Sequence, residues 1–324
     1  MTALLDVQDL SKLYPLPGGG AVRALDGVSL RLDEGEVLGI VGESGCGKST
    51  LGRAVLRLVE PSGGRVLLRG EDLLGLSRRA LKSRRRDMQI VFQDSFGSLN
   101  PRHAVGTIVG EPLAVHRVGS RRERAARVRE LLELVGLPPD AAGRYPHEFS
   151  GGQRQRIAIA RALALDPKLV VADEPLSALD VSIQSQIINL LADLRARFQL
   201  SMLFISHDLS VIRHVSDRIA VMYLGRVVET GGASAVFARP AHPYTEALLS
   251  AVPRPEAGRR ERIVLRGEMP DPAHPPSGCA FRTRCPHAFA RCAAERPALV
   301  PRRIGTGERE SACHLHVPCP REAA

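Results

Sequence analysis

The segment from Val37 to Thr50 constrains the fold more than any other part of the chain. An apolar run, Val37 to Val41, leads directly into Gly42-Glu43-Ser44-Gly45-Cys46-Gly47-Lys48-Ser49-Thr50. Glycines let backbone N–H groups turn toward one anion, and a helix that starts after Gly47 adds the positive end of its dipole. A chance glycine-rich turn is the alternative, but the full motif directly after a strand argues against it. The segment therefore predicts a strand, a phosphate-binding loop and a helix.

The residue types within this loop predict how a nucleotide is held. The Lys48 ammonium can reach the terminal phosphates, and the Ser49 hydroxyl can ligate Mg²⁺. The backbone N–H of Cys46, and not its thiol, should face the phosphate. We therefore expect a nucleotide to contact Gly42, Ser44, Gly45, Cys46, Gly47, Lys48, Ser49 and Thr50.

Apolar periodicity alternates between strand and helix through the first 250 residues. Short apolar runs predict strands at residues 4–7, 28–32, 37–41, 169–172, 202–205 and 219–224. Periods near 3.6 predict helices at residues 120–135, 151–165 and 182–198. Ser120 and Glu123 form a capping box at the start of the first of these helices. The helix after Lys48 should bury one face, formed by Leu51, Val55, Leu58 and Val59. This alternation favours an α/β fold with a mostly parallel sheet between helical layers.

Two acidic residues end the apolar run that begins at Leu169. Asp173 at a strand end can hold Mg²⁺, usually through the water shell of the ion. Glu174 projects differently and is the candidate to orient or deprotonate an attacking water. Two acids that merely cap a strand are the alternative, and the phosphate loop in the same chain favours the functional interpretation.

A second anion site is predicted at Ser150-Gly151-Gly152-Gln153. Ser150 is a good N-cap for the helix that begins at Gly151, and the free N–H groups of a helix start attract an anion. A simple capped helix is the alternative, and both interpretations can hold together. A single phosphate loop does not need this second site.

Gln93 and His207 would be unremarkable alone, because imidazole and amide groups are common hydrogen-bonding partners at strand ends. A functional role for both is favoured by their order along the chain, relative to the phosphate loop, Ser150-Gly151-Gly152-Gln153 and Asp173-Glu174. The chain resembles the ATPase subunits of ABC transporters over roughly residues 4–250.

That resemblance implies specific roles. Tyr14 resembles the aromatic residue that stacks on adenine, and Gln93 resembles the residue that links Mg²⁺ to the transmembrane partner. His207 resembles the switch histidine that contacts the γ-phosphate. Residues 177–180 resemble the loop that crosses a dimer interface. Two subunits would pack head to tail, and each ATP would lie between one phosphate loop and the Ser150-Gly151-Gly152-Gln153 segment of the other subunit.

Finer matches point to one branch of that family. Residues 92–102, 180–184 and 242–245 are similar to the oligopeptide and dipeptide importer ATPases. The resemblance implies a P-loop NTPase of ABC type, with a mostly parallel core sheet, an antiparallel β subdomain and an α-helical signature subdomain. We expect an ATPase domain at residues 1–252, its helical subdomain at about 94–165, and a Pro/Cys-rich C-terminal extension at 253–324.

The implied partners are a second ABC ATPase subunit, two transmembrane permease subunits and an extracytoplasmic substrate-binding protein. The sequence lacks an apolar run of roughly 18 residues that would span a bilayer, and Met1-Thr2-Ala3-Leu4-Leu5 has no features of a secretion signal. We therefore expect a peripheral protein on the cytoplasmic face of the cell membrane. Importers of another solute such as nickel, ribosome- or nucleic-acid-associated ATPases and a non-catalytic partner subunit are the alternatives.

The positive charge of the chain does not by itself indicate nucleic-acid binding. The formal net charge is +10, and only four of the 45 basic residues are lysines. A preference for arginine is what a GC-rich genome produces, and no nucleic-acid motif accompanies it. We therefore expect no nucleic-acid partner.

Five of the six cysteines lie after Val252. Disulfides are disfavoured in a cytoplasmic protein, and the spacing lacks a CxxC pair, so free thiols, zinc and an iron–sulfur cluster all stay open. The resemblance to peptide-importer ATPases implies a [4Fe–4S] cluster held by four ligands, Cys279, Cys285, Cys292 and Cys313.

Overall fold

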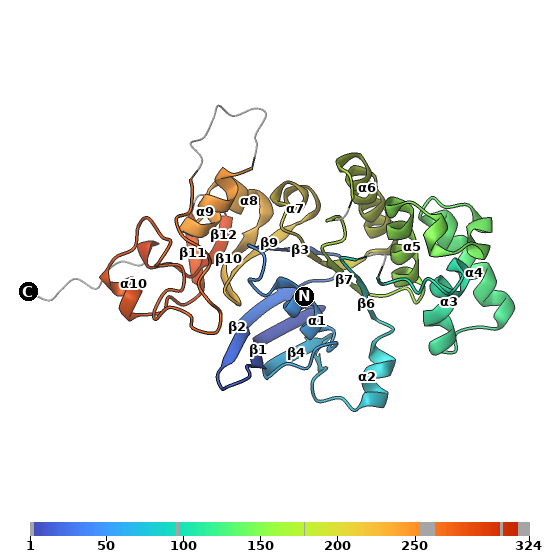
Figure 1. Ribbon diagram of the computed structural model, residues 1–324, viewed down its shortest axis with the longest axis horizontal. Coiled ribbons are helices and arrows are strands. Elements are labelled where there is room, and N and C mark those ends of the chain that lie inside the picture. The colour runs from blue at the N-terminus through green and yellow to red at the C-terminus, as the bar shows by residue number, and fades with distance from the viewer. Residues whose placement is uncertain (1–2, 95–96, 178, 253–262, 305–306, 317–324) are drawn as a thin grey trace, which may run out of the picture.

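Two sheets make up the framework of the protein (Figure 1). The computed structural model describes residues 3–94, 97–177, 179–252, 263–304 and 307–316. The larger sheet has eight strands, in the order β11 (Val300–Ile304), β12 (Gly307–Ser311), β10 (Arg226–Gly232), β9 (Arg218–Tyr223), β3 (Val37–Val41), β8 (Ser201–Ile205), β7 (Leu169–Asp173) and β6 (Met88–Val91). The smaller sheet has four, in the order β2 (Ala21–Leu32), β1 (Leu5–Pro15), β4 (Gly63–Leu68) and β5 (Glu71–Asp72).

The strands β9, β3, β8, β7 and β6 of the larger sheet run parallel to one another. Every residue of β3, β7 and β8 is buried. Parallel strands covered on both faces read as continuous apolar runs, which is why these three were visible in the sequence. The remaining strands, β10, β12 and β11, pair antiparallel at one edge. The predicted mostly parallel core sheet is confirmed.

The smaller sheet is antiparallel, as predicted. Its strands β1 and β2 are much longer than the predicted segments 4–7 and 28–32. The pairing of β1 with β2 contains register shifts, and Asp9 has a left-handed backbone with φ of 47°. These irregularities interrupt the apolar alternation, so only the ends of the strands gave a clear signal.

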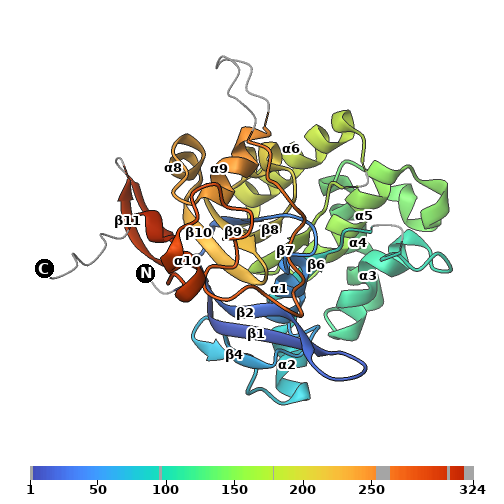
Figure 2. The same ribbon diagram turned by 60° about the vertical axis from the view of Figure 1, so that its left-hand side comes forward.

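Helix α1 (Lys48–Val55) lies between the two sheets (Figures 1 and 2) and contacts β1, β2, β7 and β8. The helix is shorter than its apolar pattern predicted. Arg57 adopts a left-handed backbone with φ of 50°, and the Leu58 N–H donates to the Arg53 carbonyl at 2.8 Å. This 6→1 bond is typical of a helix that terminates in a left-handed residue. Leu58 therefore lies outside the helix and is 44% exposed, so its predicted place on the buried face was wrong.

Helix α2 lies beside the smaller sheet (Figure 1), and most of the other helices pack around the larger sheet. Helices α3, α4 and α5 pack against one another beyond β6, and α5 also contacts α6 (Figure 1). The bounds are α2 (Arg78–Arg84), α3 (Val105–Val115), α4 (Arg121–Leu134), α5 (Gly151–Leu163), α6 (Val181–Phe198), α7 (Leu209–Val215), α8 (Ala233–Ala238), α9 (Pro243–Ser250) and α10 (Ala290–Ala294). Short 3₁₀ turns lie at Pro139–Gly143, Pro146–Glu148 and His314–His316.

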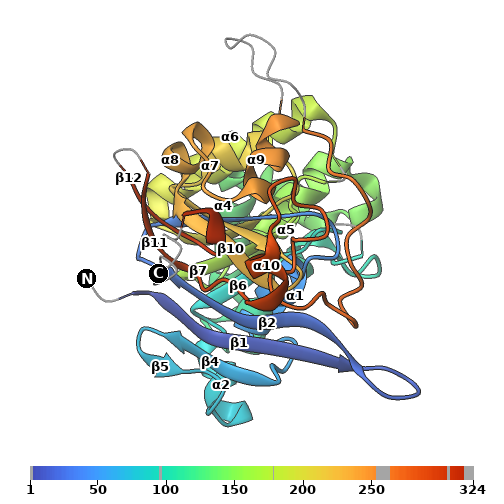
Figure 3. The same cartoon turned by 90° about the vertical axis from the view of Figure 1, so that its left-hand side faces the viewer.

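The C-terminal segment joins the main sheet and does not build a separate core. Strand β12 pairs with β10, and β11 pairs with β12 (Figure 3). Phe281 is 1% exposed, with its ring centroid 5.3 Å from that of Tyr223 and 5.4 Å from that of Tyr244. The segment is therefore packed onto β9 and α9 by aromatic contacts.

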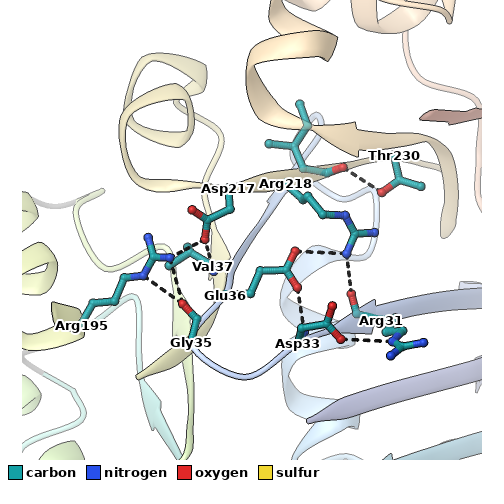
Figure 4. A network of polar contacts seen from close by, with 10 residues as sticks. Arg31, Asp33, Gly35, Glu36, Val37, Arg195, Asp217, Arg218 and Thr230 are labelled. Carbon is teal, nitrogen blue, oxygen red and sulfur yellow. Dashed lines mark hydrogen bonds and ion pairs between the residues drawn. The ribbon is translucent and has the colours of Figure 1, made fainter. Parts of the chain in front are cut away.

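Polar contacts hold the amino end of β3 in place (Figure 4). Arg195 of α6 donates to the Gly35 carbonyl and, at 2.7 Å, to the Asp217 carboxylate. The same carboxylate accepts the Val37 N–H at 2.8 Å, and Arg218 pairs with Glu36 at 3.1 Å. These contacts position the strand that leads into the glycine loop.

Within the described part of the chain, none of the helices has the length and apolarity needed to cross a membrane.

The capping box predicted for α4 is present. The Glu123 N–H donates to Ser120 Oγ at 3.3 Å, and the Ser120 N–H donates to Glu123 Oε2 at 2.6 Å. The hydrogen bond from the Ser120 N–H, followed by the Ser120 side chain, lowers the pKa of the Glu123 carboxyl group below its ordinary value.

We predict that Ser120→Ala lowers the free energy of unfolding by about 1 kcal/mol, because an N-cap acceptor is lost. Urea denaturation of the two chains measures the difference. Ser185→Ala, on the exposed side of α6, is the matched control and should change stability by less than about 0.5 kcal/mol. Equal effects of the two substitutions would contradict the role of the cap.

Candidate nucleotide-binding site

The glycine loop between β3 and α1 is pressed against two backbone carbonyls. Gly42 has φ of 155°, and a Cβ placed there would lie 2.3 Å from the Met222 carbonyl oxygen. Gly47 has φ of 106°, and its Cβ would lie 2.3 Å from the Ala24 carbonyl oxygen. A side chain at either position would clash with backbone, so the path of the loop requires glycine there.

Lys48 lies over this loop and is only 4% exposed. Its ammonium donates to the Gly42 carbonyl at 2.7 Å and to the Glu43 carbonyl at 2.9 Å. Ser44 and Gly45 are exposed, so the outer side of the loop is accessible to a ligand. The first turn of α1 contains no acidic residue, which leaves the positive end of the helix dipole for an anion. Ser49 and Thr50 lie in that same turn.

Cys46 differs from the expectation in one respect. Its thiol is fully buried, and its N–H, which was expected to face the phosphate, donates to the Glu43 carbonyl at 3.3 Å within the loop. Burial raises the pKa of the Cys46 thiol, and the neighbouring Lys48 partly offsets this. The thiol is therefore protonated at neutral pH.

Asp173, at the end of β7, is fully buried beside Ser49. The Ser49 hydroxyl donates to Asp173 Oδ1 at 2.7 Å, and Arg53 lies 3.7 Å from Oδ2. Oδ2 makes no hydrogen bond although it is buried. Burial is the main reason that the pKa of Asp173 is raised. A buried carboxylate oxygen without a hydrogen bond next to a serine hydroxyl suits Mg²⁺, which prefers oxygen ligands.

The Glu174 side chain, which follows β7, contacts residues that follow the neighbouring strands β6 and β8. Gln93 follows β6 and its Nε2 donates to Glu174 Oε2 at 3.0 Å, while His207 follows β8 and its Nδ1 lies 3.2 Å from the same oxygen. The Glu174 backbone is left-handed with φ of 47°, and its N–H donates to the Ile205 carbonyl at 3.0 Å. A left-handed non-glycine residue costs roughly 1–3 kcal/mol and is typical of functional sites. The structure thus brings together Gln93, Glu174 and His207.

The second predicted anion site lies at the start of α5. The Gln153 N–H donates to Ser150 Oγ at 3.3 Å, and the Ser150 N–H donates to Gln153 Oε1 at 3.0 Å. Ser150, Gly151 and Gln153 are exposed, whereas a Cβ on the buried Gly152 would lie 2.5 Å from Ile183 of α6. Figures 1 and 2 place α1 between the sheets and α5 among the helices beyond β6. The two predicted anion sites therefore belong to different parts of the molecule.

The loop between Glu174 and α6 is held by backbone acceptors. The Ser177 hydroxyl donates to the Glu174 carbonyl at 3.1 Å, and Gln184 Nε2 donates to the Leu176 and Leu179 carbonyls at 3.1 and 3.0 Å. Ala178, in the middle of this predicted interface loop, lies outside the described residues.

Tyr14 lies near the end of β1, paired with Val22, and is 38% exposed. The Lys12 ammonium lies 4.9 Å from its ring centroid. The ring is thus accessible on the surface of the smaller sheet, which is compatible with the predicted stacking on adenine.

The four C-terminal cysteines do not form a ready metal site. Cys279, Cys285, Cys292 and Cys313 are free thiols, and burial raises the pKa of Cys279, Cys285 and Cys313, the last to about 11. Among the described His, Cys, Asp and Glu side chains, no group of three could hold a metal ion. The structure therefore does not support the predicted [4Fe–4S] cluster.

Sequence reasoning missed three residues that contact the site. Arg53 lies beside Asp173, the Glu43 N–H donates to the Tyr244 hydroxyl at 2.9 Å, and Arg284 pairs with the Glu43 carboxylate at 2.7 and 3.1 Å. Tyr244 and Arg284 lie 201 and 241 positions from Glu43. No local sequence pattern predicts a contact between residues so far apart in the chain.

Known proteins resemble this chain over nearly its whole length. The sequence profile described as ABC transporter matches residues 25–177, and the one described as oligopeptide/dipeptide transporter, C-terminal region, matches residues 228–292. The chain is 53% identical over 323 residues to the oligopeptide transport ATP-binding protein AppF of Bacillus subtilis, covering 97% of each chain. It is 54% identical over 299 residues to a putative peptide import ATP-binding protein of Brucella ovis, covering 92% of this chain and 94% of that protein.

A solved structure shares the fold. A dimeric ATP-binding cassette in a post-hydrolysis state, bound to ADP and Pi, aligns with a TM-score of 0.65 and 33% sequence identity. The match covers 71% of this chain and 98% of that chain. Together with the two sheets described above, it confirms the fold class predicted from the sequence.

We predict that Cys46 reacts with a maleimide at least about fivefold more slowly than Cys285, because the Cys46 thiol is fully buried and the reagent cannot reach it in the folded chain. Cys285 is partly exposed and serves as the internal reference. Peptide mapping after brief labelling of the folded chain measures both rates. Chains that do carry an adduct at Cys46 should not bind ATP, because Gly42 leaves no space beside the thiol. Fast labelling of Cys46 with unchanged ATP affinity would contradict both statements.

Proposed function

Because this chain belongs to the ABC transporter ATP-binding proteins that carry the oligopeptide/dipeptide transporter C-terminal region, we propose that it energises the import of di- and oligopeptides. Membership of the family makes the chain an ATPase. One observation supports an active site in this chain itself. The side chains of Gln93 and His207 both contact the Glu174 carboxylate, next to the strand end where Asp173 accepts a hydrogen bond from Ser49.

Each side chain has a role that follows from its place. When ATP binds, the Lys48 ammonium leaves the Gly42 and Glu43 carbonyls and donates to phosphate oxygens instead. The N–H groups at the start of α1 face the same phosphates. Glu174 orients or deprotonates the attacking water. Gln93 and His207 hold the Glu174 carboxylate, and His207 contacts the γ-phosphate.

Ser49, Asp173 and Gln93 would hold Mg²⁺. The bound ion supplies positive charge that neutralises the phosphates. The hydrogen bond from Ser49 and the buried Oδ2 of Asp173 support this assignment. Since a nearby cation favours the ionised form, Mg²⁺ would reverse the upward pKa shift that burial gives Asp173.

The exposed start of α5 supports the proposal that ATP is shared between subunits. Ser150, Gly151 and Gln153 are accessible to another chain, and Tyr14 offers its ring to the adenine. We propose that a second ABC ATPase subunit contributes the complementary halves, and that the pair docks on two transmembrane permease subunits at the cytoplasmic face of the membrane. An extracytoplasmic binding protein delivers the solute.

The names of the relatives support peptides as the cargo. Purification of the assembled transporter with its binding protein tests this. Di- and oligopeptides should stimulate ATP hydrolysis in reconstituted vesicles, whereas nickel ions should not. Stimulation by nickel alone would replace the peptide proposal with the alternative of a metal importer.

We predict that Glu174→Gln slows ATP hydrolysis by about 100-fold or more while MgATP still binds, because the water loses its base. Steady-state hydrolysis and equilibrium binding measure the two effects. Glu60→Gln, on an exposed carboxylate, is the matched control and should hydrolyse ATP normally. Near-normal turnover of Glu174→Gln would remove Glu174 from the proposed mechanism.

We predict that Lys48→Ala raises the Kd for MgATP by about tenfold or more, since a charge-assisted contact to the phosphates is lost. Lys82→Ala, on an exposed side chain of α2, should leave the Kd unchanged. Titration calorimetry on the full chain compares them. Unchanged affinity of Lys48→Ala would show that the loop does not bind phosphate.

A further inference from the structure

Glu43 is the residue through which the glycine loop is held. Its carbonyl accepts from the Lys48 ammonium at 2.9 Å and from the Cys46 N–H at 3.3 Å. Its own N–H donates to the Tyr244 hydroxyl at 2.9 Å, and its carboxylate pairs with Arg284. Movement of Glu43 would therefore displace the lysine that reaches the phosphates.

Two of these contacts come from the C-terminal part of the chain. Tyr244 lies in α9 and is fully buried, and burial raises the pKa of its hydroxyl, which keeps it neutral. The Arg284 side chain is 8% exposed and donates a hydrogen bond to each carboxylate oxygen of Glu43, at 2.7 and 3.1 Å. Such bidentate pairing fixes geometry as well as charge, and it raises the pKa of Arg284.

The packing of the segment around Arg284 keeps this side chain in place. The Arg284 N–H donates to the Phe281 carbonyl at 3.0 Å, and the Phe281 ring is enclosed by Tyr223 and Tyr244. Met269, earlier in the same segment, lies within van der Waals reach of a Cβ placed on Gly45. The C-terminal segment thus contacts the glycine loop at Glu43 and lies against it at Gly45.

The charge of Glu43 is the reason that this contact matters. A carboxylate inside a phosphate-binding loop repels the polyphosphate of a nucleotide, and this repulsion is screened little where water is limited. Arg284 neutralises that charge and holds the carboxylate at the side of the loop that faces the C-terminal segment. The pairing therefore favours the loop form that accepts phosphate.

We propose that Arg284 is a positioning residue of the nucleotide site, which neutralises and orients Glu43 so that the C-terminal segment sets the affinity of the loop for MgATP. The proposal rests on the proposed function, because it requires that the loop binds ATP. Arg284 acts through Glu43 and does not touch the nucleotide.

Titration of the full chain with MgATP tests the proposal. Arg284→Ala should raise the Kd and the KM for MgATP by about tenfold, with kcat changed by less than about twofold, because an unpaired carboxylate opposes binding and leaves Glu174 unaffected. Adding Glu43→Gln to Arg284→Ala should restore the Kd to within about twofold of the unsubstituted chain. A purely structural role would not produce this rescue.

Arg282→Ala is the matched control, because Arg282 lies two residues away and its side chain donates to Ser277 of the same segment. It should leave the Kd unchanged. Equal affinities of Arg284→Ala and Arg282→Ala, or a double substitution that fails to restore binding, would overturn the proposal. An unsubstituted chain that binds no MgATP would instead refute the proposed function.

Should Arg284→Ala not fold, Glu43→Gln alone decides the question. Removal of the carboxylate charge removes its repulsion of the phosphates, so MgATP should bind as tightly as before or more tightly. Thermal unfolding and circular dichroism confirm that the variant is folded. A loss of affinity of about tenfold in folded Glu43→Gln would contradict the proposed role of the charge.

Discussion

The backbone path of the glycine loop is the constraint on which the rest of the site depends. Gly42 and Gly47 are pressed against the carbonyls of Met222 and Ala24, so both sheets limit where the loop can lie. The loop in turn sets the start of α1 and places Ser49 beside Asp173. Because β3 leads into the loop, the ion pairs at its amino end also contribute to the geometry of the phosphate site.

The parts of the site that the sequence predicted are those with a local cause. Glu174 and His207 follow the buried parallel strands β7 and β8, and the carboxyl ends of such strands meet at one edge of a sheet. Gln93 follows β6, which is only half-buried and was not predicted, so the resemblance alone indicated this residue. Ser150 and Gln153 form their capping box within four residues. For Glu174 and Ser150 a short motif and one rule of sheet or helix geometry were sufficient, whereas the roles of Gln93 and His207 came from the resemblance to ABC ATPase subunits.

The rest depends on contacts between distant segments. No periodicity signals the pairing of β12 with β10, or the ion pair between Glu43 and Arg284. The [4Fe–4S] cluster that the resemblance implied is not supported, for a related reason. Only the resemblance indicated four ligands, and whether the cysteines gather around a metal depends on the packing of the C-terminal segment, where the described residues form no group of three metal-ligating side chains.

The central claim is that the start of α5 serves an ATP held by another subunit. MgATP binding and hydrolysis by Gly151→Asp test it most directly, because an acidic residue in the first turn suits the helix dipole yet repels phosphate. The account predicts that the full chain binds MgATP normally, while hydrolysis in the assembled transporter falls by about 100-fold or more. Gly143→Asp, at an exposed position with open space, is the matched control. Weakened MgATP binding by the isolated Gly151→Asp chain would contradict the claim, since the segment would then serve its own loop.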